Sequence, residues 1–174
     1  QVPAYIIESM KLWPRDARPM DVLQATVPML SMAEKHSDVM DRDLCLQRSI
    51  GLLAQLPTLV AAWHRIRNDQ PVLAPDPELD HAGNFLWMLQ GKKPDAATAH
   101  DLDVCLILHA DHTFNASTFA AREVVSTRAS LYAGVSAGLG ALSGSLHGGA
   151  NAKVMEMLLK LEHEPDIEGW VEKQ

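Results

Sequence analysis

Hydrophobic residues recur every three or four positions along almost the whole chain, and this spacing constrains the fold more than any other feature. A period near 3.6 residues places apolar side chains on one face of an α-helix, whereas a half-buried β-strand needs strict alternation, which no segment shows. Aromatic residues make up only 5% of the chain, and β-branched runs are scarce. The pattern therefore predicts an all-α, multi-helical fold.

Prolines divide this helical pattern into short segments. Pro14, Pro28, Pro57 and Pro165 stand where a helix should stop, kink or begin, because proline lacks the backbone donor that a helix interior needs. The proline-rich region 68–78 is expected to be a loop. The expected helices cover residues 4–12, 19–27, 41–55, 58–67, 80–89, 94–108, 115–127, 131–142 and 151–162.

Two of the expected helices have an unusual composition. The run Val104–Leu108 is wholly apolar, so we expect it to be buried, since no polar face remains there. In the segment 131–142, small residues gather on one face, and such a face lets another backbone approach closely. Tight packing within the chain and a helix–helix dimer contact both fit this face. Its small residues are Ala133, Gly134, Ala137, Gly138 and Ala141.

Composition narrows the class of protein. With 174 residues and 47% hydrophobic residues, the chain is long enough for one globular domain with a real core. The net charge of -7 argues against a general nucleic-acid binder or a binder of anionic membranes. We also expect no signal peptide and no membrane span. Cys45 and Cys105 lie in apolar helical runs and are expected to be small buried hydrophobes, which indicates a reducing compartment such as the cytoplasm.

Most of the eight histidines are expected on helical surfaces or at a helix start, namely His36, His64, His81, His100 and His163. The block His109-Ala110-Asp111-His112 differs, because it places two imidazoles and a carboxylate at the end of an apolar helix. These groups could bind a metal ion, bind an anion at the next helix start, or be hydrogen-bonded core residues. The residues alone leave these three interpretations open.

A second block, His147-Gly148-Gly149, comes directly before the last expected helix. Glycines allow a backbone to approach a ligand, and a helix start offers free N–H donors. A histidine near the positive end of a helix is pushed toward its neutral form, which can donate a hydrogen bond to a carbonyl that is becoming an enolate. A dinucleotide-binding loop is rejected, because it needs a preceding strand.

The sequence around these two blocks resembles citrate synthase. The resemblance is carried by His109–His112 with Asn115–Phe119, by Leu146–Asn151, and by the number of residues that separates the two histidine blocks. Three earlier segments also match: Arg18–Leu23, Leu56–Arg67 and His81–Leu89. The resemblance covers essentially the whole chain and is nearest to the bacterial and archaeal type, which includes the 2-methylcitrate synthases. It implies a dimeric all-α enzyme with a large and a small domain, and it assigns residues 1–174 to a central segment of the large domain.

The resemblance also implies an activity and site residues. The family condenses acetyl-CoA with oxaloacetate to citrate and CoA in the tricarboxylic acid cycle, without a metal or a cofactor, since acetyl-CoA is a substrate. His147 matches the catalytic histidine that hydrogen-bonds the thioester carbonyl, and His112 matches a histidine that binds oxaloacetate. The positions that match residues shaping the site are His109, Asn115, Gly148, Gly149 and Asn151.

The match is incomplete in ways that affect activity. The family's second catalytic histidine, in a Gly-His-Arg-Val-Tyr type motif, and its catalytic aspartate are not found in this sequence. The family's N-terminal section and small domain are likewise expected to lie outside it, so we expect the 174 residues alone to be inactive. Ser145 stands where a proline is common, and Thr113-Phe114 is a further departure.

Three alternatives remain at the level of sequence. The nearest is 2-methylcitrate synthase, which uses propionyl-CoA. The others are a metal-dependent hydrolase using His109, Asp111 and His112, and a non-catalytic helical interaction module that uses the small-residue face.

Overall fold

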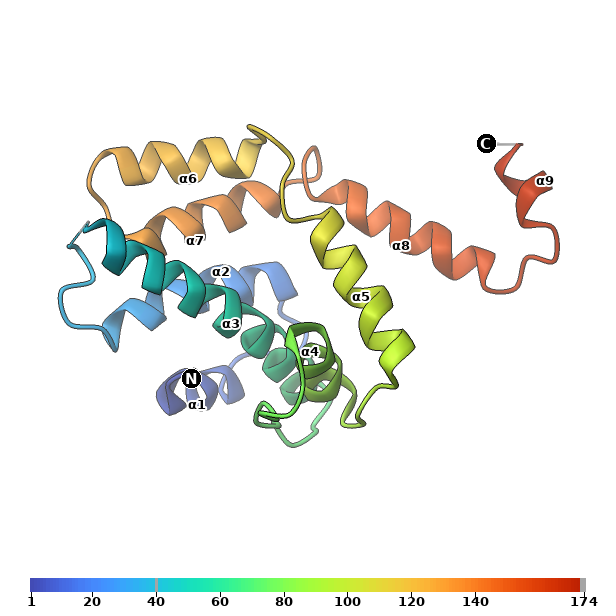
Figure 1. Cartoon of the computed structure of the whole chain (residues 1–174), viewed down its shortest axis with the longest axis horizontal. Helices are drawn as coiled ribbons and strands as arrows, with labels where there is room; N and C mark the ends of the chain where they lie inside the picture. Colours follow the sequence, from blue (N-terminus) through green and yellow to red (C-terminus); the bar gives the residue numbers. More distant parts are fainter. Residues whose placement is uncertain (40, 173–174) are drawn as a thin grey trace.

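A computed structural model describes residues 1–39 and 41–172, and within these residues every regular element is a helix (Figure 1). The predicted all-α fold is therefore confirmed. The helices are α1 (Ala4–Lys11), α2 (Pro19–Met32), α3 (Arg42–Arg67), α4 (His81–Gln90), α5 (Ala96–Leu108), α6 (Ala116–Ser126), α7 (Leu131–Leu142), α8 (Gly149–Leu161) and α9 (Ile167–Val171).

The expected helix boundaries hold to within a few residues, with one larger correction. The segments predicted as 41–55 and 58–67 form the single helix α3, which continues through Pro57. Proline deprives the carbonyl of Leu53 of its helical partner, but Leu53 is exposed, so that carbonyl is accessible to water. The residues after Pro57 pack into the core, which favours a continuous helix. Pro28 likewise lies inside α2, and the short helix α9 was not predicted.

The hydrophobic core lies where α1, α2, α3 and α7 meet. Ile6, Met10 and Val27 have no exposed surface, and burial of each such side chain contributes about 1.5–3 kcal/mol. The buried members of this core are Ile6, Met10, Val22, Val27, Leu30, Leu52, Leu59, Ala62, Trp63, Ile66 and Tyr132.

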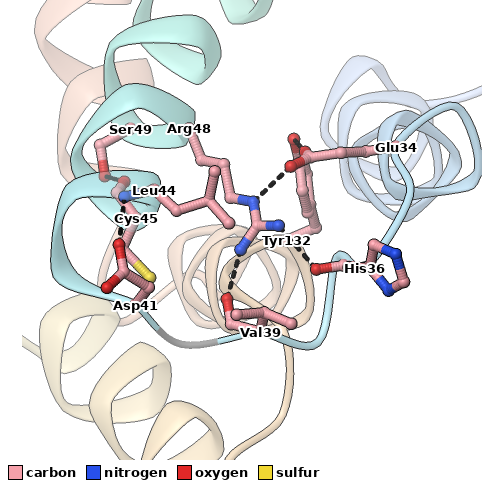
Figure 2. Close-up of polar contacts among 9 residues, drawn as sticks. All are labelled: Glu34, His36, Val39, Asp41, Leu44, Cys45, Arg48, Ser49 and Tyr132. Atoms are coloured by element: carbon pink, nitrogen blue, oxygen red, sulfur yellow. Dashed lines mark hydrogen bonds and ion pairs between the residues drawn. The ribbon is translucent and has the colours of Figure 1, made fainter.

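A buried arginine joins the connection between α2 and α3 to the core (Figure 2). The Arg48 side chain is 3% exposed, and its Nε donates to Oε1 of Glu34 at 2.5 Å. The same guanidinium donates to the carbonyls of Val39 at 2.5 Å and His36 at 2.7 Å. From α7, the Tyr132 hydroxyl donates to the other carboxylate oxygen of Glu34. One carboxylate in the connection after α2 is thus bonded to both α3 and α7.

This cluster shifts the ionisation of its members. Burial works against the charge on Glu34, but hydrogen bonds from Tyr132 and Arg48 outweigh it and lower the pKa of the carboxyl. Burial and the hydrogen bond to Glu34 raise the pKa of Tyr132 to about 12. The Arg48–Glu34 pair therefore stays charged across the physiological pH range.

Among the described residues, α3 is the one helix long and apolar enough to cross a membrane by length and composition. Its C-terminal half packs into the core. Leu59, Trp63 and Ile66 belong to the hydrophobic core, and the buried Arg65 donates to the carbonyls of Pro71 and Leu89. Arg65 thereby holds the connection between α3 and α4 against the end of α4.

The small-residue face of α7 packs within the chain. A Cβ atom added at Gly134 would lie 2.5 Å from Cγ2 of Val125, and one added at Gly138 would lie 3.3 Å from the Ser117 carbonyl oxygen. Both neighbours belong to α6, which runs alongside α7 (Figure 1). Of the two interpretations of this face, intrachain packing is the one the structure contains.

The prediction that Val104–Leu108 is buried is wrong. Ile107 and Leu108 are 65% and 74% exposed, and no residue of α5 is buried. An apolar run indicates only that a segment requires cover. Within the described residues α5 contacts α4, but the apolar side chains of Ile107 and Leu108 are left uncovered. For the same reason Cys105 is exposed, and Cys45 is half-buried rather than buried.

Candidate functional site

The first histidine block lies in the connection between α5 and α6. His109 is the C-cap residue of α5, and its Nδ1 lies 2.7 Å from the carbonyl oxygen of Cys105. The carboxylate of Asp111 accepts a hydrogen bond from the backbone N–H of Thr113 at 2.9 Å. His109 and His112 are exposed rather than buried, so the interpretation as hydrogen-bonded core histidines is wrong.

Asn115 begins the next helix. It is the N-cap residue of α6, and its side-chain oxygen accepts a hydrogen bond from the N–H of Thr118 at 2.9 Å. This cap satisfies one of the free donors at the helix start and fixes where the connection ends. The predicted site residue Asn115 therefore has a clear local role in shaping this end of the site.

His147 stands in the connection between α7 and α8, and it is half-buried. Its Nε2 lies 2.8 Å from Oγ of Ser117, a residue in the first turn of α6. This hydrogen bond joins the first turn of α6 to the connection that carries His147, near the point where α5, α6, α7 and α8 converge (Figure 1). The structure thus brings together Ser117 and His147, which are 30 positions apart in the sequence.

Ser117 is a residue of the candidate site that the motifs did not single out. The segment Asn115–Thr118 is predicted as a cluster of helix-capping residues and as part of the family resemblance, and the cap is Asn115 alone. A usable signal was present. The small residues of α7 favour a close neighbouring helix, and α6 comes immediately before α7 in the chain. Two consecutive helices joined by a short connection pack antiparallel, so the start of α6 lies near the end of α7. His147 follows that end.

The two glycines after His147 differ in what they do. Gly148 is the N-cap residue of α8 with φ -75°, so no left-handed backbone requires glycine there. A Cβ atom at Gly148 would, however, lie 1.9 Å from the carbonyl oxygen of Leu142. At Gly149 the nearest atom would be 3.8 Å away. Glycine is therefore required at Gly148 but not at Gly149. The close approach at Gly148 shows that the start of α8 lies directly against the end of α7.

The remaining predicted site residue, Asn151, lies in α8. Its side chain is outside the part of the chain that the structure describes.

The arrangement has a definite chemical capability. A hydroxyl that donates to Nε2 of His147 places the imidazole proton on Nδ1, which leaves Nδ1–H free to donate to a ligand oxygen. The N–H groups at the start of α8 provide further donors close by. Within residues 1–39 and 41–172, no group of three His, Cys, Asp or Glu side chains is placed to hold a metal ion.

Comparison with known proteins was made for the whole chain. The family model described as citrate synthase, C-terminal domain, matches residues 1–174. A citrate synthase from Synechocystis sp. is 41% identical over 99% of this chain and 44% of its own length. A 2-methylcitrate synthase from Mycobacterium tuberculosis is 37% identical over 91% of this chain and 40% of its own length.

Solved structures agree with this. Citrate synthase from Pyrobaculum aerophilum superposes with a TM-score of 0.80 at 34% identity, covering 99% of this chain and 45% of that one. Citrate synthase from Thermoplasma acidophilum, solved with carboxymethyl coenzyme A and oxaloacetate, gives a TM-score of 0.85 at 25% identity, covering 100% of this chain and 45% of that one. The chain therefore shares the all-helical fold of these structures over less than half of their length.

The chain belongs to the citrate synthase family. It spans less than half the length of the curated relatives that it matches. The family assignment made from the motifs is thereby confirmed, whereas the roles of the individual site residues stay predictions.

Proposed function

We propose that this chain contributes part of the active site of an enzyme that condenses acetyl-CoA with oxaloacetate to give citrate and CoA. The observation that carries the proposal is the 2.8 Å contact between Ser117 and His147 within a chain of this family. In the proposed state the Ser117 hydroxyl donates to Nε2, so that Nδ1–H of His147 is free to donate to the substrate. His147 is the catalytic residue in this proposal, and Ser117 is its positioning residue.

The chemistry follows from the orientation of His147. A carboxylate removes a proton from the methyl carbon of acetyl-CoA, and Nδ1–H of His147 stabilises the oxygen of the enol that forms. The enol carbon then attacks the ketone carbon of oxaloacetate, which His112 binds, and water hydrolyses the resulting thioester. The resemblance places the carboxylate and a second histidine outside these 174 residues, so the isolated chain is expected to show no turnover.

The supporting residues complete this picture. Asn115 and His109 fix the two ends of the connection that carries His112, and Gly148 permits the sharp turn after His147. Gly149 and Asn151 belong to the start of α8, where backbone donors face the site. No metal or cofactor is needed for the reaction.

Biological context follows from the same proposal. The enzyme would serve the tricarboxylic acid cycle in the cytoplasm and act as a homodimer. The charge of -7 argues against a nucleic-acid partner, and the core packing of α3 argues against membrane insertion.

Propionyl-CoA is the alternative substrate, because a 2-methylcitrate synthase is among the relatives at 37% identity. The metal-dependent hydrolase is not favoured by the geometry, since His109 and Asp111 are each hydrogen-bonded to their own backbone connection. The interaction module is not favoured either, since α6 already covers Gly134 and Gly138 on the small-residue face of α7.

Steady-state release of CoA tests the proposal. The protein that carries this chain should consume oxaloacetate with acetyl-CoA, propionyl-CoA or both, and product analysis should show citrate or 2-methylcitrate. A higher kcat/KM for propionyl-CoA would select the alternative. An absence of CoA release with both substrates would contradict the proposed function.

A further inference from the structure

The backbone immediately after His112 adopts a conformation that its residue type disfavours. Thr113 has φ +53°, in the left-handed region that β-branched residues rarely enter. Such a conformation persists only where the surrounding structure holds it. The hydrogen bond from the Thr113 N–H to Asp111 is one restraint on it. Because Thr113 follows His112 directly, its φ sets how the backbone that carries His112 is oriented relative to the start of α6.

A second restraint comes from the next residue, Phe114. Its ring packs edge-to-face on Phe119, with ring centroids 5.9 Å apart and an interplanar angle of 84°. On the same ring, the guanidinium of Arg122 lies 5.0 Å from the centroid. Both partners belong to α6, so Phe114 is attached to a capped helix rather than to another part of the same connection. These geometries are the favourable ones for an aromatic pair and a cation–π contact.

The exposure of these rings shows that burial alone does not explain the contact. Phe114 and Phe119 are 56% and 55% exposed. An exposed phenylalanine in a free connection would leave Thr113 to relax toward the extended region. Here the ring instead lies between two side chains of α6, and the three residues Phe114, Phe119 and Arg122 form what we call the aromatic clasp.

We propose that Phe114 is a positioning residue, which the aromatic clasp holds so that Thr113 stays left-handed and His112 points toward bound oxaloacetate. The inference rests on the proposed function, because it takes His112 as the residue that binds the keto acid. It adds a determinant of oxaloacetate affinity that does not touch the substrate itself.

Kinetics of variants in the protein that carries this chain test the clasp. Phe114→Ala removes both ring contacts and should raise KM for oxaloacetate about 5- to 10-fold. The kcat should stay within about twofold and KM for the acyl-CoA should not change, because chemistry and thioester binding rest on His147. Phe114→Tyr retains the ring and should restore the wild-type KM.

Arg122→Gln removes only the cation and should raise KM for oxaloacetate about 2- to 5-fold. Combined with Phe114→Ala it should add nothing, since both changes break the same contact. Arg42→Gln is the matched control for the arginine change, because the Arg42 side chain is 93% exposed in its pair with Asp43, and this variant should leave every constant unchanged.

Amide hydrogen exchange gives a readout that needs no activity. Phe114→Ala should speed exchange at the Thr113 amide about tenfold and leave the amides of α3 unchanged. An unchanged KM for oxaloacetate in an active enzyme would overturn the positioning role while leaving the proposed function intact. Unchanged exchange at Thr113 would overturn the clasp itself, and a wild-type protein without condensation activity would instead overturn the proposed function.

Discussion

The helices α1, α2, α3 and α7 differ sharply from α5 and α8 in how their apolar side chains are used. The first group supplies the buried core, whereas α5 has no buried residue and α8 carries a row of exposed apolar side chains, including Leu158 and Leu159. α8 extends away from the body of the molecule, whereas α5 runs from α4 toward the start of α6 (Figure 1). Similar amino-acid composition therefore produces a packed region and an uncovered region in one chain.

The candidate site lies where these two regions meet. Ser117 and His147 lie at the ends of α6 and α7 that adjoin α8, and His112 follows α5, which has no buried residue. The comparison shows that the two parts of the candidate site are held differently. The Ser117–His147 pair is positioned by helices that pack on the core, whereas His112 follows a helix whose apolar side chains are exposed. This agrees with the match to less than half of each relative's length.

The largest effect is expected at the buried ion pair of the packed region. Arg48→Met would leave Glu34 without its cation and two backbone carbonyls without donors, and should lower the free energy of unfolding by about 3–5 kcal/mol. Denaturant unfolding measures it. Arg42→Met is the control, because Arg42 is almost fully exposed in its pair with Asp43 and should change stability by less than about 0.5 kcal/mol.

A matched leucine pair tests the comparison itself. Leu59 is 1% exposed in the core, so Leu59→Ala should destabilise the chain by about 2–5 kcal/mol. Leu158 is 49% exposed on α8, and Leu158→Ala should cost less than about 1 kcal/mol in the 174-residue chain. Equal losses from the two variants would show that α8 is packed in solution and would remove the distinction between the regions.

The glycine pair at the boundary should give a smaller contrast. Gly148→Ala places a Cβ against the Leu142 carbonyl and should cost about 1–3 kcal/mol through a forced shift of the backbone. Gly149→Ala meets nothing closer than 3.8 Å and should be neutral or slightly stabilising, since alanine favours a helix. Thermal unfolding of both variants measures the difference, and equal melting temperatures would contradict the close approach.

The smallest effect is the pH dependence of the Glu34 cluster. The pKa of Glu34 is lowered from its usual 4.5, so its stabilisation is present above that pH and is lost as pH falls through the folded-state value. The pKa of Tyr132 is raised from 10.0 to about 12, so its stabilisation is complete below pH 10 and is lost between the two values. Stability curves of wild type and Glu34→Gln should separate as pH rises through the acid range to about 4.5 and keep a constant offset at neutral pH, and curves that run parallel through the acid range would argue against the cluster.

Much of the fold could be predicted from the sequence because its signals are local. The period of apolar residues, the capping residues and the prolines located most helices to within a few residues, and α7 was predicted with its exact bounds. The continuous α3 could not be predicted, because the packing of Leu59 and Trp63 outweighs the local cost of Pro57.

The site was predictable in part. The motifs identified His147, Asn115 and Gly148, whose positions have clear structural roles, but the link through Ser117 depends on how α6 lies against α7. The prediction that Val104–Leu108 is buried was wrong. An apolar sequence indicates that a segment packs against something, but it does not say which part of a protein covers it.

The most direct test of the account is the turnover and stability of His147→Ala in the protein that carries this chain. We predict that kcat for CoA release falls about 10²- to 10⁴-fold. The free energy of unfolding should change by only about 1 kcal/mol, the value of the lost hydrogen bond to Ser117. An unchanged kcat, or a loss of activity that merely follows a loss of folded protein, would contradict a catalytic role for His147.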